Sequence, residues 1–334
     1  MRRRTFVDER VSVSELAEFA RELHEQFSGG VERPLEAVAY PSTGEMLTDI
    51  RAVIFDVYGT LINYWREEMK DETGRRNLFI DACGKVAALF GFTDFLAAIN
   101  PEAPPENTLY DLYCGLIALR REKAHQPGIT NREIKIEEVW NIILLMLKRH
   151  GFRPDLAPGV QEDLSRRLAY AYNFFSLGRR LYPGVTEALS GLRDASIDLG
   201  IVSNAQFYTP IDLTLLIRDQ SEGIYEDFNE LFDPDLTIFS FEWGAVKPDV
   251  LLFSKLYDAL YERNILPQQT VFAGNDLVLD VEPAAAAGMK TAFFTGDSRS
   301  VYFHDREGVI LPDIVFSSFD ELCRKISFHS AAMG

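Results

Sequence analysis

The segment RAVIFDVYGTLI, residues 51–62, constrains the fold of this chain more than any other. Apolar residues run straight into Asp56, and a tyrosine, a glycine and a threonine follow. This pattern predicts a buried strand that ends at Asp56 beside a glycine-containing turn. A carboxylate in such a place is held rigidly yet faces a substrate, as covalent catalysis by a carboxylate requires. An aspartate that only caps a turn explains the segment equally well, because short motifs carry a false-positive risk.

Composition narrows the class of protein. The 334 residues carry a net charge of −17, with a pI near 4.8. This charge opposes binding to nucleic-acid phosphates or anionic lipid, so neither nucleic acid nor a membrane is an expected partner. Cys83, Cys114 and Cys323 are far apart and match no disulfide or zinc pattern. Without an apolar run of about 18 residues, the chain is expected to be soluble and cytoplasmic, with about two domains.

Residues 1–49 stand apart as an amino-terminal helical extension and linker. Ser12 and Glu15 match a capping box, and apolar residues recur behind them at helical spacing up to Phe27. The pattern predicts an amphipathic helix that ends near residues 28–30 and whose apolar face needs a partner. The body of the same chain is the first candidate and a homodimer contact is the second. Prolines and a glycine between residues 30 and 49 indicate a linker.

The rest of the chain shows two patterns. Up to about residue 180 the apolar spacing is helical, and four helices are predicted, near 65–91, 106–125, 136–150 and 159–177. Strands then alternate with helices, near 197–202, 236–240, 270–273, 290–294 and 313–316. These strands are short and apolar on both faces, which indicates a parallel sheet covered on both sides. Residues 50–62 and 181–334 therefore form one core, and residues 63–180 form a helical insertion.

Two later segments place polar residues beside predicted strand ends. IDLGIVSNA ends a strand in Ser203 and Asn204. Ligands bind at the carboxyl edge of open parallel sheets, so Ser203 has a positional reason to face a substrate. In GAVKPDVLLF, Lys247 precedes a proline that suits the first turn of a helix. A lysine there can keep a nearby carboxylate ionised and neutralise an anionic substrate. Taken alone, a capping serine and a surface lysine are the simpler interpretations.

A fourth segment, VFAGNDLVLDVEPAAAAG, breaks a predicted strand at Gly274 and then presents Asp276 and Asp280. Two carboxylates near Asp56 would make an oxygen-rich site suited to Mg²⁺. Helix capping by Asp276 explains one of these acids, but less easily both.

The four segments, in this order at predicted strand ends, resemble the haloacid dehalogenase superfamily of hydrolases over roughly residues 50–318. The resemblance implies an α/β fold, with a doubly wound, Rossmann-like parallel-sheet core and an all-helical cap inserted at residues 63–180. It implies that Asp56 is the nucleophile, assisted by Lys247, Ser203 and Thr60, and that a small anionic substrate lies against Tyr58, Gly59 and Asn204. The implied Mg²⁺ ligands are Asp56, the backbone carbonyl of Tyr58, Asp276, Asp280 and, as an alternative, Asn275.

Tyr58 departs from the pattern of the family's phosphatases, which carry a second aspartate there as general acid and base. A tyrosine with a pKa near 10 is a poor base at neutral pH. Tyrosine at this place is what the family's 2-haloacid dehalogenases have. Those enzymes need no metal, lack the acidic Asp276 and carry a cap arginine whose sequence context is not found between residues 63 and 110. The basic residues Arg120, Arg121 and Lys123 are more typical of a solvated face.

The loop after Gly274 that carries Asp276 and Asp280, called the acidic loop here, departs from the family pattern as well. In the commoner form of the family motif an aspartate directly follows the glycine, whereas here Gly274 is followed by Asn275 and then by Asp276. Either Asp276 reaches the metal through a one-residue shift, or Asn275 is the ligand and the affinity is weak. The strings NREIKIEEVW, TGDSRSVYF and SNAQFY look like a bacterial hydrolase subgroup that also carries DVYGT, which implies only a generic hydrolase.

Three functions follow from these patterns. A magnesium-dependent phosphatase of a small phosphorylated metabolite ranks first, because clustered acids are costly without a cation. A metal-independent 2-haloacid dehalogenase, indicated by Tyr58, ranks second. A catalytically silent fold that binds a ligand or a partner ranks third. In each catalytic case the helical insertion is expected to close over Asp56 and to set the size of the substrate.

Overall fold

The computed structural model describes residues 9–27, 34–44, 46–122, 131–154, 163–304 and 310–328. The chain divides into two compact units. The helical unit comprises Met1–Val31, Arg66–Ala124 and Ile134–Gly178. The sheet unit comprises Glu32–Trp65, His125–Glu133 and Arg179–Gly334. The amino-terminal helix therefore belongs to the helical unit, whereas the sequence pattern placed it in an extension of its own.

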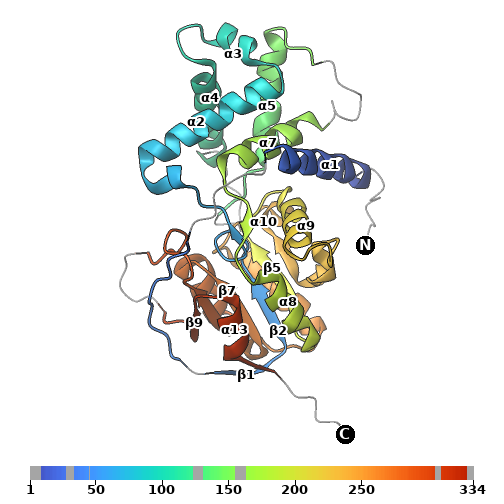
Figure 1. Ribbon diagram of the computed structural model, residues 1–334, viewed down its shortest axis with the longest axis vertical. Helices are drawn as coiled ribbons and strands as arrows, with labels where there is room; N and C mark the ends of the chain where they lie inside the picture. Colours follow the sequence, from blue (N-terminus) through green and yellow to red (C-terminus); the bar gives the residue numbers. More distant parts are fainter. Residues whose placement is uncertain are drawn as a thin grey trace. The chain divides into compact units, whose positions relative to one another are not determined.

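Six parallel strands form the main sheet, in the order β6-β5-β2-β7-β8-β9 (Figure 1). Their bounds are β2 Ala52–Phe55, β5 Asp198–Ser203, β6 Thr237–Phe239, β7 Thr270–Gly274, β8 Lys290–Phe294 and β9 Ile314–Phe316. Within β2, Phe55 pairs with Ile201 of β5 on one side and with Ala273 of β7 on the other. The five strands predicted after residue 180 agree with the structure to within one residue at each end, and the expected α/β class is confirmed.

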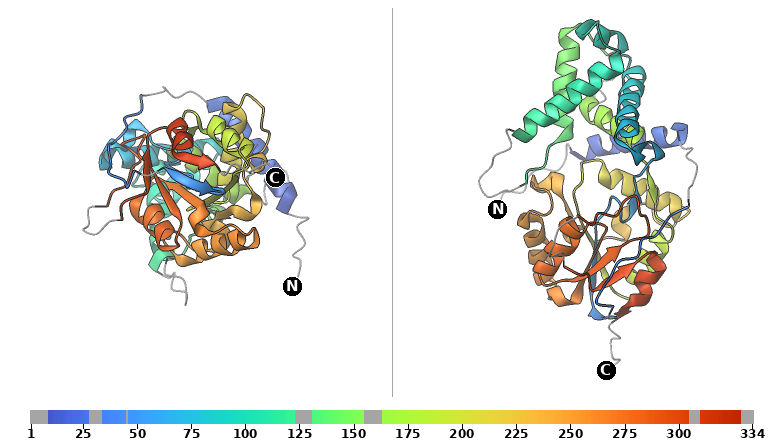
Figure 2. Two further views of the ribbon diagram at one scale, coloured as in Figure 1. Left: turned by 90° about the horizontal axis from the view of Figure 1, so that it is seen from below. Right: turned by 90° about the vertical axis from the view of Figure 1, so that its left-hand side faces the viewer.

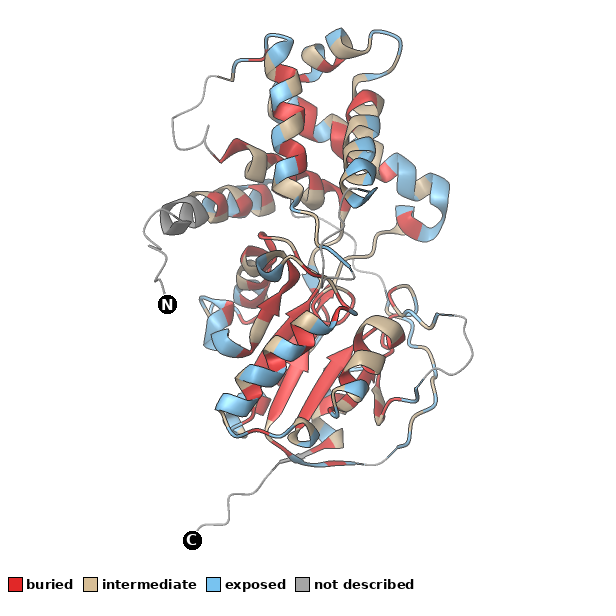
Figure 3. Cartoon of the chain, turned by 180° about the vertical axis from the view of Figure 1, so that it is seen from behind, coloured by how far each residue is buried: buried red, intermediate tan, exposed pale blue. Residues whose placement is uncertain are grey.

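Helices cover both faces of this sheet (Figures 1 and 2). They are α8 Val185–Asp194, α9 Thr209–Gln220, α11 Val250–Glu262, α12 Glu282–Ala286 and α13 Phe319–Lys325. Val53 and Phe55 enter one hydrophobic cluster with α8, α9 and α13, while Ala52 and Ile54 enter another with α11 and α12. All four side chains of β2 are fully buried, and Figure 3 shows the strands as a buried layer. Burial on both faces explains why the strands read as continuous apolar runs.

Two small sheets were not predicted. Strand β1 (Leu47–Ile50) pairs in parallel with β10 (Ile326–Phe328), and β3 (Ile62–Asn63) pairs antiparallel with β4 (Arg180–Leu181). Pairs of two to four residues are too short to show a periodicity, so the sequence offers little signal for them.

The segment at residues 34–44, expected as a linker, lies along the sheet unit without regular secondary structure. Its backbone donates from Val38 N to the Thr295 carbonyl at 2.9 Å and from Gly44 N to the Asp313 carbonyl at 3.1 Å. The Tyr40 ring packs on the ring of Phe293, with centroids 5.2 Å apart. These contacts fix the segment to the strand β8 side of the sheet.

The helical unit contains α1 Glu9–Phe27, α2 Glu72–Leu89, α3 Thr93–Ile99, α4 Pro105–Glu122, α5 Ile136–Arg149 and α7 Leu164–Ser176. The start predicted at Ser12 is wrong, because α1 already begins at Glu9 and the capping-box pattern lies inside the helix. Leu16 and Ala20 of α1 are buried, and Phe19 lies edge-on to Tyr170 of α7. The partner of the apolar face is thus within the same chain.

No single helix in the part of the chain that the structure describes is long and apolar enough to cross a bilayer. One pair, α2 with α3, meets the length and composition criteria only together and across a bend of 116°.

Candidate active site

Asp56 follows β2 directly, at the edge where the parallel strands end. The residue is 7% exposed. One carboxylate oxygen, Oδ1, accepts hydrogen bonds from Ser203 Oγ at 3.0 Å and from Lys247 Nζ at 2.6 Å. No described residue hydrogen-bonds to the other oxygen, Oδ2. The carboxylate is therefore held by one oxygen, which leaves the second available to attack a substrate.

Ser203 and Asn204 contact different residues of the site. Ser203 is the fully buried last residue of β5, and its hydroxyl contacts Asp56. Asn204 holds the neighbouring loop instead: its Oδ1 accepts from the backbone N of Lys247 at 2.6 Å. Asn204 was expected to border the substrate. The contact found here is with the backbone of Lys247, in the loop between Gly244 and α11 that is called the lysine loop below.

Lys247 lies just before α11, at a cis peptide bond to Pro248, and is 3% exposed. Its Nζ donates at 2.6 Å both to Asp56 Oδ1 and to Asp280 Oδ1. Burial lowers the pKa of the ammonium, but the carboxylates of Asp280 and Asp56 outweigh it, so the pKa of Lys247 rises above 10.5. Lys247 is therefore a buried cation shared by two carboxylates.

Asp280 is the second partner of that cation and is 1% exposed. It lies in the π-helical turn Leu277–Val281, and its Oδ2 accepts from the backbone N of Asp276 at 3.0 Å. A Cβ atom on Gly274 would lie 2.3 Å from that oxygen, so only glycine fits at the end of β7. Burial raises the pKa of Asp280 to about 7, against the opposing effect of Lys247.

Asp276 caps the π-helical turn. Its Oδ1 accepts from the backbone N of Val278 and of Leu279, both at 2.8 Å. His304 Nε2 lies 2.9 Å from Oδ1 and 3.0 Å from Oδ2 of the same carboxylate. His304 was missed from the sequence. Its only signal is its place just after the TGDSRSVYF string, which lies far along the chain from Asp276.

Asn275 is buried beside the turn that follows Asp56. Its Oδ1 accepts from Thr60 Oγ1 at 3.0 Å, and its Nδ2 donates to the Ser300 carbonyl. Gly59 has a φ of +89°, and a Cβ there would lie 2.3 Å from Asn275 Nδ2. Gly59 is thus required for close approach of the two loops, and Thr60 binds Asn275.

Three of the side chains expected to hold Mg²⁺ have protein partners in this structure. Asp280 binds Lys247, Asp276 caps a helical turn and pairs with His304, and Asn275 binds Thr60. Among the described residues, no three His, Cys, Asp or Glu side chains are grouped so that they could hold a metal ion. A hard cation needs several free oxygen ligands. The side-chain oxygens of Asp280, Asp276 and Asn275 already have side-chain or backbone partners, whereas Asp56 Oδ2 accepts no hydrogen bond from the described residues. Without rearrangement, only Asp56 Oδ2 among the expected side-chain ligands is free to meet a cation.

A single substitution should create the missing ligand. Asn275→Asp places a carboxylate directly after Gly274, and we expect it to confer Mg²⁺ binding. At a Mg²⁺ concentration ten times the dissociation constant, the variant should gain about 1.4 kcal/mol in unfolding free energy. Calorimetric titration and thermal unfolding, with and without Mg²⁺, measure this. Asn275→Ala is the control: like Asn275→Asp it loses the hydrogen bond to the Ser300 carbonyl, it also loses the one from Thr60, and it adds no charge. Mg²⁺ stabilisation of the unmodified chain equal to that of the variant would contradict the expectation.

Tyr58 does not face the Asp56 carboxylate as a base. Its hydroxyl lies 3.0 Å from Thr209 Oγ1 at the start of α9. Burial raises the pKa of Tyr58 well above 10, and the charge of Asp212 adds to the rise. The phenol therefore stays neutral throughout the physiological range.

Removal of this hydroxyl should consequently leave the pH dependence of catalysis unchanged. We expect Tyr58→Phe to lower kcat less than about tenfold, the loss of a single neutral hydrogen bond. The profile of kcat/KM between pH 6 and 9 should keep its shape, because Tyr58 does not ionise there. Loss of either limb of the profile in the variant would show that Tyr58 moves a proton.

The run of basic residues near the end of α4 lies at the solvent-exposed surface where the structure describes it. Arg120 Nη1 makes an exposed ion pair with Glu138 Oε2 at 2.6 Å, and Arg121 is exposed. Lys123 lies outside the described residues. This agrees with the interpretation of the run as a solvated face.

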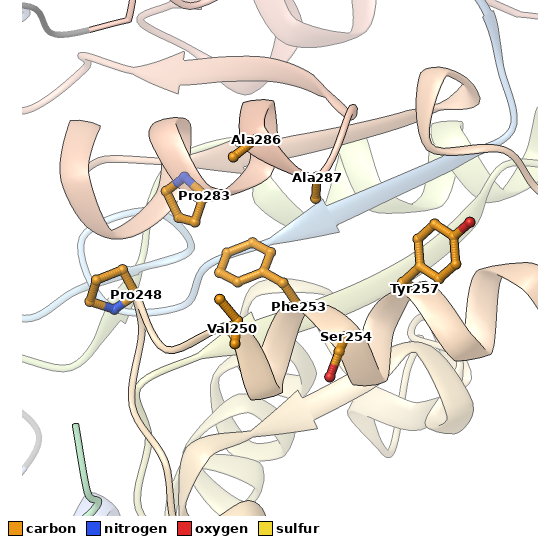
Figure 4. Close-up of a pocket in the computed structure, with 8 residues that line it drawn as sticks. All are labelled: Pro248, Val250, Phe253, Ser254, Tyr257, Pro283, Ala286 and Ala287. Atoms are coloured by element: carbon orange, nitrogen blue, oxygen red, sulfur yellow. The ribbon is translucent and has the colours of Figure 1, made fainter. Parts of the chain in front are cut away.

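A separate cavity of about 370 Å³ lies between α11 and α12 (Figure 4). Pro248, Val250, Phe253 and Pro283 line it together with small and hydroxyl side chains, none of them charged. Pro248 follows Lys247, but the lysine ammonium binds Asp56 and Asp280. The cavity is thus apolar and contributes no chemical group to the site around Asp56.

Comparison with known proteins agrees with this geometry. The haloacid dehalogenase-like hydrolase family matches residues 50–288. No curated protein matches the chain. Among solved structures, the chain is similar to a 2-haloacid dehalogenase from Pseudomonas syringae pv. Tomato DC3000, with 18% identity and a TM-score of 0.50 over 83% of this chain and 97% of that chain.

Other solved structures of this fold carry different names. A HAD phosphatase from Thermococcus onnurineus is 17% identical, with a TM-score of 0.44 over 82% of this chain and 97% of that chain. A HAD-hydrolase from Bacillus subtilis bound to magnesium is 19% identical, with a TM-score of 0.43 over 84% and 99%. The family match spans the strand before Asp56, the lysine loop and the acidic loop. The chain therefore belongs to the haloacid dehalogenase-like hydrolases.

Proposed function

We propose that this chain is a hydrolase that works without a resident metal, uses Asp56 as a covalent nucleophile, and acts on a small 2-substituted carboxylic acid of the haloacid type. The observation that carries this proposal is the unequal environment of the two Asp56 oxygens. Oδ1 is held by Ser203 and Lys247, while Oδ2 has no hydrogen bond from any described residue. The cation that holds Oδ1 is the ammonium of Lys247, which supports a nucleophile oriented by the protein alone.

The first step forms an ester. Oδ2 attacks C2 of the acid, the carbon–halogen bond breaks, and its electron pair leaves with the halide. Lys247 and Ser203 keep the carboxylate in one orientation during the attack, which supplies the positioning part of the rate enhancement.

The second step hydrolyses the ester at Cγ of Asp56. Water attacks Cγ, negative charge develops on Oδ1, and the bond from Cγ to Oδ2, which now carries C2, breaks so that Oδ2 leaves as the hydroxyl oxygen of the product. The product is a 2-hydroxy acid, the carboxylate is regenerated, and one proton passes to solvent. Ser203 Oγ and Lys247 Nζ already donate to Oδ1, so they are placed to stabilise the charge that develops there.

The test uses a single turnover in H₂¹⁸O. With enzyme in excess over 2-chloropropionate, one ¹⁸O should enter the Asp56 peptide, a mass increase of about 2 Da, while the first product keeps ¹⁶O. Halide release measured in parallel gives the stoichiometry. Label in the product but not in the peptide would mean direct attack by water, and no halide release from short 2-haloacids would reject this substrate class.

A magnesium-dependent phosphatase is the second candidate, favoured by the gathering of Asp56, Asp276 and Asp280 at one edge of the sheet. It requires Asp276 to leave His304 or Asn275 to leave Thr60. Turnover of phosphate esters that requires Mg²⁺ and is lost in Asp56→Asn would establish it in place of the first proposal.

A further inference from the structure

Glu133 belongs to the insertion by sequence, between α4 and α5, but lies in the sheet unit. The segment 131–133 pairs with the loop that leads into Lys247. Val246 N donates to the Asn131 carbonyl at 2.9 Å, and Glu133 N donates to the Gly244 carbonyl at 3.0 Å. Arg132 and Ala245 form an antiparallel bridge between these two bonds. The backbone of the loop that leads into Lys247 is therefore held by an isolated β-bridge to a segment that the core sequence does not supply.

The Glu133 side chain ties this loop to the one that follows Ser203. Its Oε1 accepts from Gln206 Nε2 at 2.8 Å, and its Oε2 accepts from Ser240 Oγ. Ser240 is fully buried, and its Oγ in turn accepts from the backbone N of Ala205 at 2.8 Å. One carboxylate thus joins the segment at residues 204–206, which follows β5, to the short helix α10 (Ser240–Trp243) that precedes the loop of Lys247.

Both loops continue to the nucleophile. Ser203 and Lys247 are the two donors to Asp56 Oδ1. Gln206 N also donates to Thr209 Oγ1 at 3.3 Å, and that hydroxyl lies 3.0 Å from the Tyr58 hydroxyl. Glu133 is therefore connected along the backbone of these two segments to the two donors of Asp56 Oδ1, and through Gln206 and Thr209 to the Tyr58 hydroxyl.

We propose that Glu133 is a positioning residue, which sets the places of Ser203 and Lys247 around Asp56 Oδ1 through Gln206 and Ser240. The kinetic part of this inference rests on the proposed hydrolysis by Asp56. A displacement of about 1 Å in a positioned group can cost roughly 100-fold in rate, so a small loosening of these loops should be visible in kcat.

Glu133→Gln tests the connection with little change in volume. The new amide keeps both contacts only with its oxygen toward Gln206 and its NH₂ group toward Ser240, whose hydroxyl must then donate to the Ala205 carbonyl at 3.0 Å. Two charge-assisted hydrogen bonds thereby become neutral ones of roughly half the strength, which loosens the connection. We expect kcat to fall about tenfold or more with KM changed less than about threefold. Amide hydrogen exchange should rise in residues 204–207 and 244–247. Glu137→Gln, a nearby substitution in the first turn of α5, should change neither measurement.

A paired substitution provides the rescue. In Glu133→Gln with Gln206→Glu, the amide at position 133 donates to the new carboxylate at position 206 and still accepts from Ser240 through its oxygen. The bond is restored with its direction reversed, so kcat should return to within about threefold of the unmodified enzyme and exchange should return to its starting level.

The exchange measurement decides the inference even if no substrate is turned over, so its failure is distinct from failure of the proposed function. Unchanged exchange in both loops of Glu133→Gln, or a paired variant no better than the single one, would overturn the positioning role. If Glu133→Gln does not fold, the paired variant alone decides: it must fold and show exchange like that of the unmodified chain.

Discussion

Asp56→Asn should abolish turnover and leave the fold intact. The side-chain oxygen of asparagine can still accept from Ser203 and Lys247, as Asp56 Oδ1 does, but the nitrogen that replaces Oδ2 is not a nucleophile. Removal of the nucleophile from a covalent mechanism costs roughly 10⁴-fold or more in kcat. The rate of halide release, followed at enzyme concentrations high enough to see a single turnover, measures the loss.

The control for this prediction lies at the opposite edge of the same sheet. Asp198 begins β5, where the parallel strands start, and Asp198→Asn should leave kcat unchanged to within about twofold. Circular dichroism and thermal unfolding should show both variants folded. Retention of more than a tenth of the activity in Asp56→Asn would remove the covalent mechanism, and with it the assignment of the site.

The sheet could be predicted because its strands are buried on both faces. Val53, Ile54 and Phe55 form a continuous apolar run, which is typical of a parallel strand buried on both faces, and the later strands repeat this pattern. The short strands β1, β3, β4 and β10 could not be predicted in the same way. Their pairing depends on segments distant in the chain, such as Leu47 with Ile326. The anchoring of residues 34–44 likewise comes from tertiary contacts that the local sequence does not encode.

The residues of the site likewise fall into those that could be predicted from the sequence and those that depend on tertiary contacts. Asp56, Ser203 and Lys247 could be brought together from the sequence, because strand order places the residues that follow β2 and β5 at one edge. The acidic loop could not be resolved in this way. Asp276 was the expected metal ligand and Asn275 its alternative, and their partners in the structure include His304 and Ser300, which reach them from a segment that follows β8. The choice between a metal site and a protein cation thus depends on contacts that the motif does not contain.

Lys247→Met should be the most destabilising of the substitutions considered. It replaces the ammonium by an apolar group of similar length and leaves two buried carboxylates, Asp56 and Asp280, facing each other without a cation. Breaking a buried ion pair by removing one partner costs about 3–5 kcal/mol. It also removes a donor from Asp56 Oδ1, so kcat should fall roughly 100-fold or more. Urea unfolding and halide release give the two numbers.

The loss of stability should depend on pH with a definite sign. Burial already raises the pKa of Asp280 from 3.8 to about 7, although Lys247 lowers it. Between these values the folded protein binds a proton that the unfolded chain does not, so the unfolding free energy falls as pH rises through this window. Without Lys247 the ionised carboxylate has no counterion, and its pKa should rise further. The destabilisation by Lys247→Met should therefore be larger at pH 8 than at pH 5.5.

Lys290→Met is the control that separates the stability lost with the buried ion pairs of Lys247 from the stability lost with any lysine. Lys290 makes an ion pair with Asp313 at 3.4 Å, but its side chain is 43% exposed. A solvated pair of this kind contributes about 0–1 kcal/mol, so the control should lose little stability at either pH. If Lys247→Met lost the same stability at pH 5.5 and pH 8, Asp280 would not be the group that titrates. The buried lysine would then act through packing alone, and the case for a protein cation in place of a metal beside Asp56 would lose its electrostatic basis.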